Sequence, residues 1–99
     1  MRAMTTSPDP EWIATGRRLR WLREHFGFSQ REFAEVIGAQ GNRYGNWERG
    51  HQRLSLDGAR SIKNRFGVSL DFLIDGDASS LPANLLKAWV ATPRNSSSQ

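Results

Sequence analysis

The chain has 99 residues, of which 37% are hydrophobic and 24% charged, with no cysteine and a net charge of +4. This length supports one domain, and the composition is typical of a small globule rather than a disordered or fibrous chain. The absence of cysteine excludes a disulfide framework and a thiolate metal site. No run approaches the roughly 18 apolar residues of a membrane span, and the first residues lack the apolar segment of a signal peptide. A cytoplasmic protein without a membrane partner is therefore expected.

All but two of the 14 basic residues are arginine, the exceptions being Lys63 and Lys87. Arginine forms planar, two-pronged contacts with phosphate and guanine, whereas lysine acts as a point charge. An arginine-rich composition follows equally from a GC-rich genome. The charge therefore permits nucleic-acid binding but does not establish it.

The sequence predicts an N-terminal arm, a helical domain, a C-terminal helix and a tail. Residues 1–10 hold two prolines among polar residues and are expected to be flexible. Residues 11–77 form the predicted helical domain, and residues 78–92 form a C-terminal helical segment for packing or dimerisation. Residues 93–99 are a serine-rich tail that is expected to be disordered. Because no strand pattern is visible, the predicted fold class is all-α.

Five helices are predicted in the domain, at about 11–26, 30–37, 40–49, 56–66 and 70–74. Most of them end at a glycine, which adopts the left-handed conformation that closes a helix. The last helical segment opens at Pro82 and stops at Pro93. A 100° projection of the first helix gives it one apolar face, which consists of Trp12, Thr15, Leu19, Leu22 and Phe26.

The second predicted helix has an explicit start. Ser29 and Glu32 have the spacing of a capping box, in which each side chain bonds the other residue's backbone amide. Phe28 and Phe33 fit the hydrophobic staple that accompanies this box. With Gly38 as a stop, the pattern predicts two short helices joined by a tight turn.

The third predicted helix, 40–49, has two different faces. Tyr44 and Trp47 point to one side, whereas Asn42, Asn46 and Arg49 point to the other. Asparagine can bond adenine through two hydrogen bonds, and arginine can bond guanine in the same way. A surface helix without such a role would normally carry better helix formers than asparagine. This face, flanked by Arg43, is therefore predicted to read base edges in duplex DNA.

Gly41 and Gly45 interrupt the same helix, and each costs about 1 kcal/mol relative to alanine in a helix interior. Two explanations stand side by side. The glycines could let the helix backbone approach DNA or a neighbouring helix closely, or they could relieve crowding around the bulky Tyr44 and Trp47.

Other polar residues are candidates for a framework around this helix. Arg23 and Glu48 lie at the edges of two buried faces, and an ion pair between them would fix the angle between their helices. Gln30 and Arg31 begin the second helix, where free amide groups favour a phosphate. Further candidate phosphate contacts flank the recognition helix and are Gln40, Arg49, His51 and Arg53.

Three quoted segments carry a resemblance to a known family. G-R-R-L-R-x-L-R-x-x-x-G-F-S-Q-R-E-F-A-x-x-I-G is followed by W-E-R-G and by F-G-V-S-L-D-F-L-I-D-G-D. Over about Gly16–Asp77 the chain resembles the lambda-repressor/Cro-like helix-turn-helix transcriptional regulators, of the xenobiotic-response-element type. The resemblance implies a five-helix DNA-binding domain, usually dimeric on palindromic operators, in a bacterial or phage protein.

By the same resemblance, Gln30 would contact a phosphate, and Arg23 and Glu48 would form the interhelical pair. Positions 41, 42, 43 and 46 would face base edges. The chain departs from the family pattern at Tyr44, where a small aliphatic residue is usual, and at Gly41 and Gly45, where polar residues are usual. Gly41 offers no side chain to read a base.

Other functions find less support in the residues. His25 and His51 are far apart, the acidic residues near the end lack the spacing of a calcium loop, and no catalytic motif is visible. We therefore expect no enzymatic activity, no metal and no cofactor. The alternative function is an antitoxin, which would bind a protein toxin as well as DNA.

A second apolar ridge on the first helix consists of Ile13 and Trp21. The C-terminal segment offers a matching set, Leu85, Leu86, Trp89 and Val90. We expect these two surfaces to meet, either within one chain or across the two-fold axis of a homodimer.

Overall fold

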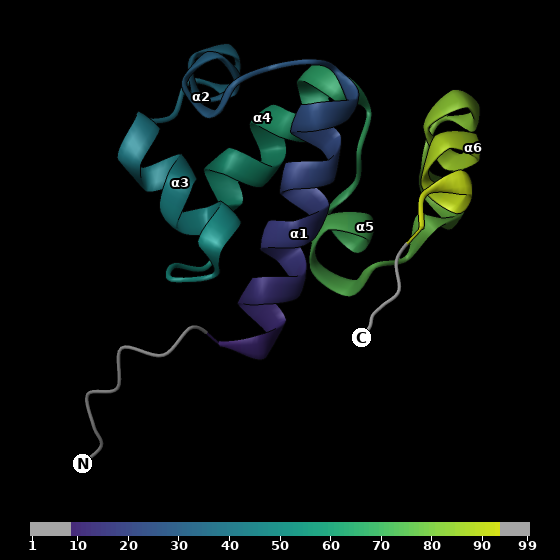
Figure 1. The fold of residues 1–99 in the computed structure, drawn as a ribbon, viewed down its shortest axis with the longest axis horizontal. Coiled ribbons are helices and arrows are strands. Elements are labelled where there is room, and N and C mark those ends of the chain that lie inside the picture. Colours follow the sequence, from purple (N-terminus) through teal and green to yellow (C-terminus); the bar gives the residue numbers. More distant parts are fainter. Residues whose placement is uncertain (1–8, 94–99) are drawn as a thin grey trace.

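The computed structural model describes residues 9–93, and these fold into six α-helices and one short 3-10 helix (Figure 1). No strand occurs within this range. The elements are α1 (Pro10–His25), α2 (Gln30–Ile37), α3 (Gly41–Arg49), α4 (Leu56–Phe66), α5 (Leu70–Asp75), η1 (Ala78–Ser80) and α6 (Ala83–Ala91). The prediction of an all-α fold with five domain helices and a C-terminal helix is confirmed.

Most of these helices begin at a residue with a polar side chain, and α2 to α5 end at a glycine. Ser29, Ser55 and Ser69 each accept a hydrogen bond from a backbone amide in the first turn of their helix. The capping box between Ser29 and Glu32 is complete in both directions. The C-caps of α2 to α5 are glycines in the left-handed region, with φ between 74° and 77°.

The first helix begins earlier than the sequence predicted. Asp9 caps it by accepting from the amide of Glu11, so Pro10 is the first helical residue rather than part of a flexible arm. A proline suits this position because its missing N–H would have no partner in the helix. The rest of the predicted arm, residues 1–8, and residues 94–99 of the predicted tail lie outside the described residues.

The core lies where α1 to α5 meet. Its largest fully buried side chains are Tyr44, Phe33, Phe72, Leu19, Leu22, Ile62, Leu73 and Val68. Phe26, which was predicted on the buried face of the first helix, is 41% exposed instead. It is the C-cap of α1, where the backbone leaves helical geometry, so the 100° projection no longer places its side chain.

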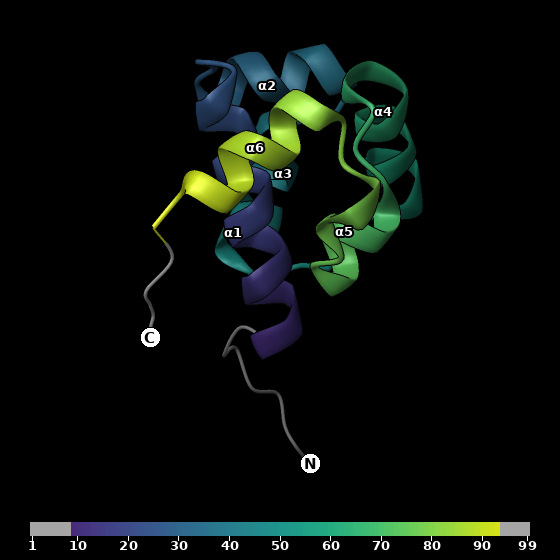
Figure 2. The ribbon, with the colours of Figure 1, turned by 90° about the vertical axis from the view of Figure 1, so that its right-hand side faces the viewer.

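The C-terminal helix packs on its own domain. Trp21 of α1 makes an edge contact with the ring of Trp89 at 4.9 Å between centroids, and its indole donates to the hydroxyl of Thr92 at 3.0 Å. Phe72 of α5 also meets the ring of Trp89, at 5.0 Å. Figures 1 and 2 show α6 crossing beside α1 on the side away from α3.

Within the expected packing surface, Leu85 is buried and Leu86 is partly buried against the core. Two of its residues take no part in this packing within the chain. Val90 is 67% exposed, and Ile13 lies at the other end of α1, against Gly50. Helix α6 packs near Trp21, whereas Ile13, eight residues earlier on α1, lies against the loop that follows α3.

No helix among residues 9–93 has the length and apolar character that crossing a membrane requires.

Candidate DNA interface

Helix α3 packs against the middle of α1, and α2 packs on α3 and α4. Gly16 of α1 touches the end of α3 so closely that a Cβ added to it would lie 2.2 Å from the carbonyl oxygen of Glu48. Beneath α3, Gly58 of α4 gives the same kind of room to the ring of Trp47, which would lie 2.6 Å from an added Cβ. Two glycines therefore allow α3 to pack closely, one against its backbone and one against the ring of Trp47.

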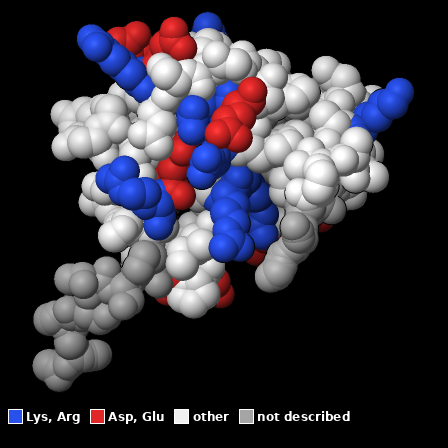
Figure 3. Space-filling model, viewed as in Figure 1, with Lys and Arg blue, Asp and Glu red and all other residues white. Residues whose placement is uncertain are grey.

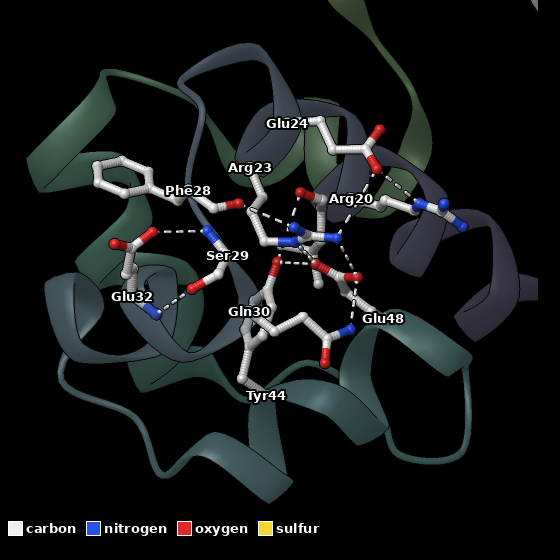
Figure 4. A network of polar contacts seen from close by, with 10 residues as sticks. Arg20, Arg23, Glu24, Phe28, Ser29, Gln30, Glu32, Tyr44 and Glu48 are labelled. Carbon is white, nitrogen blue, oxygen red and sulfur yellow. Dashed lines mark hydrogen bonds and ion pairs between the residues drawn. The ribbon is translucent and has the colours of Figure 1, made fainter.

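A buried polar network ties α1, α2 and α3 together around the carboxylate of Glu48 (Figure 4). Arg23 donates to this carboxylate through Nε at 2.6 Å and through Nη2 at 3.3 Å. Gln30 donates to it through Nε2 at 3.0 Å, and the hydroxyl of Tyr44 donates at 2.5 Å. The Glu48 side chain is 4% exposed, so these donors replace water around a buried charge.

Arg23 also reaches the segment between α1 and α2, where its Nη1 donates to the carbonyl of Phe28 at 2.9 Å. One guanidinium therefore fixes the end of α3 and the segment that leads into α2. The hydrogen bond to Glu48 raises the pKa of Arg23, so its charge is permanent. The geometry indicates that this network fixes the orientation of α1, α2 and α3 relative to one another.

Tyr44 stands where a small aliphatic residue was expected, and the structure gives a reason for the difference. Its ring fills the core beside Phe33, 5.2 Å away between centroids, and its hydroxyl extends to Glu48. Burial raises the pKa of Tyr44 above its ordinary value, and the bond to the carboxylate raises it further. The hydroxyl stays protonated and serves as a donor.

The face of α3 that points away from the core carries the predicted base-reading residues. Gly41, Asn42 and Arg43 are exposed, and Asn46 is half-buried. The guanidinium of Arg43 lies over the ring of Trp47, 5.2 Å from its centroid, which is a cation–π contact. These side chains form one polar strip along α3.

An open groove runs beside this strip, between the first turns of α2 and α3. Its lining consists of Ser29, Gln30, Arg31, Ala34, Glu35, Ala39, Gly41 and Asn42. Residues from the first turns of both helices line it, and the amide groups of a helix start favour an anion. Of the two hydrogens on the Gln30 amide nitrogen, one is donated to Glu48, which leaves the second for another acceptor.

The other candidate phosphate contacts lie around the strip. Arg31 is exposed, 3.9 Å from Glu35, and Gln40 is exposed just before α3. Arg49 is exposed at the end of α3, and His51 and Arg53 are exposed in the loop that follows. Figure 3 shows charged side chains gathered over α1 and the α2–α3 side, whereas the surface over α6 is mostly uncharged.

Sequence reasoning missed two supports of this site, namely Gly16 and the hydroxyl of Tyr44. A glycine inside a predicted helix, next to its apolar face, indicates close approach of another backbone, so Gly16 carried a usable signal. No grouping of three or more metal-ligating side chains occurs among the described residues.

Comparisons with known proteins agree with this geometry. Residues 19–73 match the family model described as helix-turn-helix. The chain is 31% identical over 65 residues to the HTH-type transcriptional regulator ImmR of Bacillus subtilis, covering 66% of this chain and 51% of that protein. It is 34% identical over 62 residues to the repressor protein CI of Enterobacteria phage phi80, covering 63% of this chain and 26% of that protein.

The chain thus spans about half the length of the first relative and about a quarter of the second. A crystal structure of the clp gene regulator ClgR from C. glutamicum shares the fold, with a TM-score of 0.60 and 24% identity over 79% of this chain and all of that one. The family match covers more than half of the chain, including both helices of the pair and the network that holds them. The chain belongs to the helix-turn-helix family, in the lambda-repressor/Cro-like group that its motifs indicated.

Proposed function

We propose that this chain binds duplex DNA with sequence preference and regulates transcription, with α3 in the major groove. The observation that carries the proposal is the division of α3 into two faces. Tyr44 and Trp47 are buried, while Asn42, Arg43 and Asn46 lie on the side away from the core. A helix held this firmly, with amide and guanidinium groups outward, suits recognition of base edges.

The groove between α2 and α3 supports the second part of the proposal, which concerns phosphate. Gln30 and Arg31 would hold the backbone on one side of α3, and Arg53 and His51 would hold it on the other. Such contacts position the protein without reading sequence. The relatives named as a transcriptional regulator and a repressor support regulation of transcription, with repression as the expected direction.

The first experiment is selection of bound sequences from a random duplex library, followed by affinity measurements on the preferred and an unrelated sequence. Asn42→Ala and Asn46→Ala should each lose about 1–3 kcal/mol of preference. Gln30→Ala and Arg53→Ala should weaken both duplexes alike. Lys87→Ala, on α6, removes a positive charge on the side away from α3 and serves as the control. Equal losses on both duplexes from the asparagine variants would show that these residues do not read bases.

We further propose that two copies bind an inverted repeat. The two α3 helices would then be about 34 Å apart, one turn of B-DNA. A series of half-site spacings tests this arrangement. A spacing near 10 base pairs between half-site centres should bind best, and adding about half a turn should abolish the gain from the second half-site. Affinity that ignores the spacing would contradict the two-fold arrangement.

A further inference from the structure

A second contact on the outer face of α3 differs from the family pattern and involves Gly45. Arg49 turns back along its own helix, and its Nη2 donates to Oδ1 of Asn46 at 2.8 Å. Its guanidinium lies over Gly45, where an added Cβ would be 3.1 Å from Nη1 and 3.5 Å from Nη2. The missing side chain of Gly45 therefore leaves the space that the guanidinium occupies.

This contact fixes the orientation of the Asn46 amide. A guanidinium only donates hydrogen bonds, so the oxygen of the amide faces Arg49 and its nitrogen faces away. The oxygen has a second lone pair, and the nitrogen keeps both of its hydrogens. An amide held in this way offers one acceptor and one donor side by side, which matches the N6 donor and N7 acceptor of adenine.

We propose that Arg49 is a specificity-determining residue, which positions Asn46 for a base and depends on Gly45 for its place. The sequence alone gave Arg49 a phosphate contact and left the reason for Gly45 open. The inference rests on the proposed function, because it needs α3 to read base edges. It also explains why Gly45 is tolerated, since any side chain at this position would take space from the guanidinium.

The same region holds a third group. Oε1 of Gln30 lies 3.6 Å from the position of the added Cβ on Gly45, so the guanidinium and the Gln30 amide oxygen border the same small space. Any side chain at position 45 would therefore compete with both groups for this space. Gly41 lacks any such neighbour, because nothing lies within 4 Å of a Cβ added there.

The test measures affinity for the library-selected duplex and for an unrelated duplex, for the full chain and for Asn46→Ala, Arg49→Ala and the double variant. Asn46→Ala should lower the ratio of the two affinities roughly 5- to 150-fold. We expect Arg49→Ala to lower this affinity ratio by at least about fivefold. The double variant should lose no more of the ratio than Asn46→Ala alone.

A phosphate contact predicts a different result for Arg49→Ala. The affinities for both duplexes would fall together, and the slope of log K against log salt would lose about 0.9. That outcome, or additive losses in the double variant, would overturn the inference. Lys87→Ala again controls for the loss of one charge. If the unaltered chain shows no preferred duplex at all, the proposed function itself fails; a preference that survives Arg49→Ala but not Asn46→Ala removes only the role of Arg49.

Gly45→Leu gives an independent measurement, because its side chain would take the place of the guanidinium. In the Arg49 background this substitution should reduce the preference several-fold, and in the Arg49→Ala background it should add little. An equal loss in both backgrounds would mean that leucine obstructs the DNA directly, which contradicts the proposed dependence. A thermal unfolding curve for each variant establishes that the folded protein is being compared.

Discussion

At the scale of single residues, the tyrosine at position 44 has the largest consequence for the site. A small aliphatic residue would fill the core but would leave the Glu48 carboxylate with two side-chain donors, Arg23 and Gln30. The Tyr44 hydroxyl adds a third. Hydrogen bonds to a charged acceptor contribute about 1.5–3 kcal/mol each. The ring and the hydroxyl together thus join the core to the interhelical brace.

Tyr44→Phe should lower the free energy of unfolding by about 1–3 kcal/mol at neutral pH, because it keeps the ring and removes the hydroxyl that bonds Glu48 and lies 3.5 Å from the carbonyl of Leu19. The pH dependence follows from the raised pKa of Tyr44. The unfolded chain releases the tyrosine proton above its ordinary value of 10.0, while the folded chain retains it. Stability is therefore full below that pH and falls above it, by about 1.4 kcal/mol for each pH unit.

Urea unfolding at pH 8 and at pH 11 measures both effects. Since Tyr44 is the single tyrosine of the chain, Tyr44→Phe should remove the part of the alkaline loss that tyrosine ionisation causes. An unchanged alkaline slope in Tyr44→Phe would contradict this explanation of the network.

Arg23→Met should destabilise the fold by about 3–5 kcal/mol, because it leaves the buried Glu48 charge without its cation. The double variant Arg23→Met/Glu48→Gln should recover part of the loss, since a neutral amide can still accept from Tyr44. Denaturation in urea, which is uncharged, gives the free energies of the unaltered chain and the two variants under the same ionic conditions. A double variant that is less stable than Arg23→Met would mean that the charge of Glu48 is favourable without Arg23.

At the scale of elements, the packing of α1 on α3 depends on a position with no side chain. Gly16 brings the two backbones together at the residue that also holds the polar network, Glu48. A Cβ there cannot be accommodated by rotating a side chain, because its neighbours are backbone atoms of Trp47 and Glu48. The two helices would have to separate, which would also stretch the bonds from Arg23.

Gly16→Ala should therefore cost about 1–3 kcal/mol, the range of an overpacked core, in spite of the higher helix propensity of alanine. Gly41→Ala is the matched control, because an added Cβ there meets nothing within 4 Å. That variant should unfold at an equal or higher temperature. If Gly16→Ala is as stable as Gly41→Ala, then α1 and α3 do not meet as closely as described.

The comparison of expectation and structure is also clearest at this scale. Helices α2, α4 and α5 were predictable because a capping serine begins each one and a glycine ends it, whereas α3 is marked locally only at its end, by Gly50. The ion pair of Arg23 with Glu48 was suggested by helix faces and by the family resemblance. The limits of local reasoning appear where a helix stops, as at Phe26, or where two distant segments meet.

The choice of partners for α6 is such a case. The apolar residues on α6 and the ridge on α1 were visible, but only the tertiary structure decides that Trp21 takes part and Ile13 does not. The conformation of the Arg49 side chain could likewise not be predicted from the sequence, since it depends on the space above Gly45.

At the scale of the whole molecule, the chain separates its two surfaces. The α2–α3 side carries the polar strip, and α6 packs on the other side of α1 (Figure 2). The ring of Trp89 on α6 contacts the rings of Trp21 and Phe72. Stability of this side should therefore change independently of DNA contacts.

Trp89→Ala should lower the free energy of unfolding by about 2–4 kcal/mol, somewhat less than a fully buried tryptophan, while the DNA affinity of the folded protein stays within about twofold. Val90→Ala is the matched control on the same helix, because Val90 is 67% exposed and should contribute within about 0.5 kcal/mol. Equal losses from the two variants would mean that α6 does not pack as described. Sedimentation of Trp89→Ala shows whether the same residue also serves a dimer.

The arrangement of the aromatic rings has a spectroscopic consequence. The ring centroids of Trp21 and Trp89 lie 4.9 Å apart, where α1 meets α6. Trp47 belongs to α3, and the Arg43 guanidinium lies over its ring. Rings so close to each other couple their electronic transitions, so near-ultraviolet circular dichroism of the Trp21–Trp89 pair reports whether α6 is docked. The emission of Trp47 responds to the cation above it, and drawing Arg43 onto DNA would change that emission. The chain has four tryptophans, so the response of Trp47 is read as the change in total emission on adding DNA, and the dichroism follows the docking of α6.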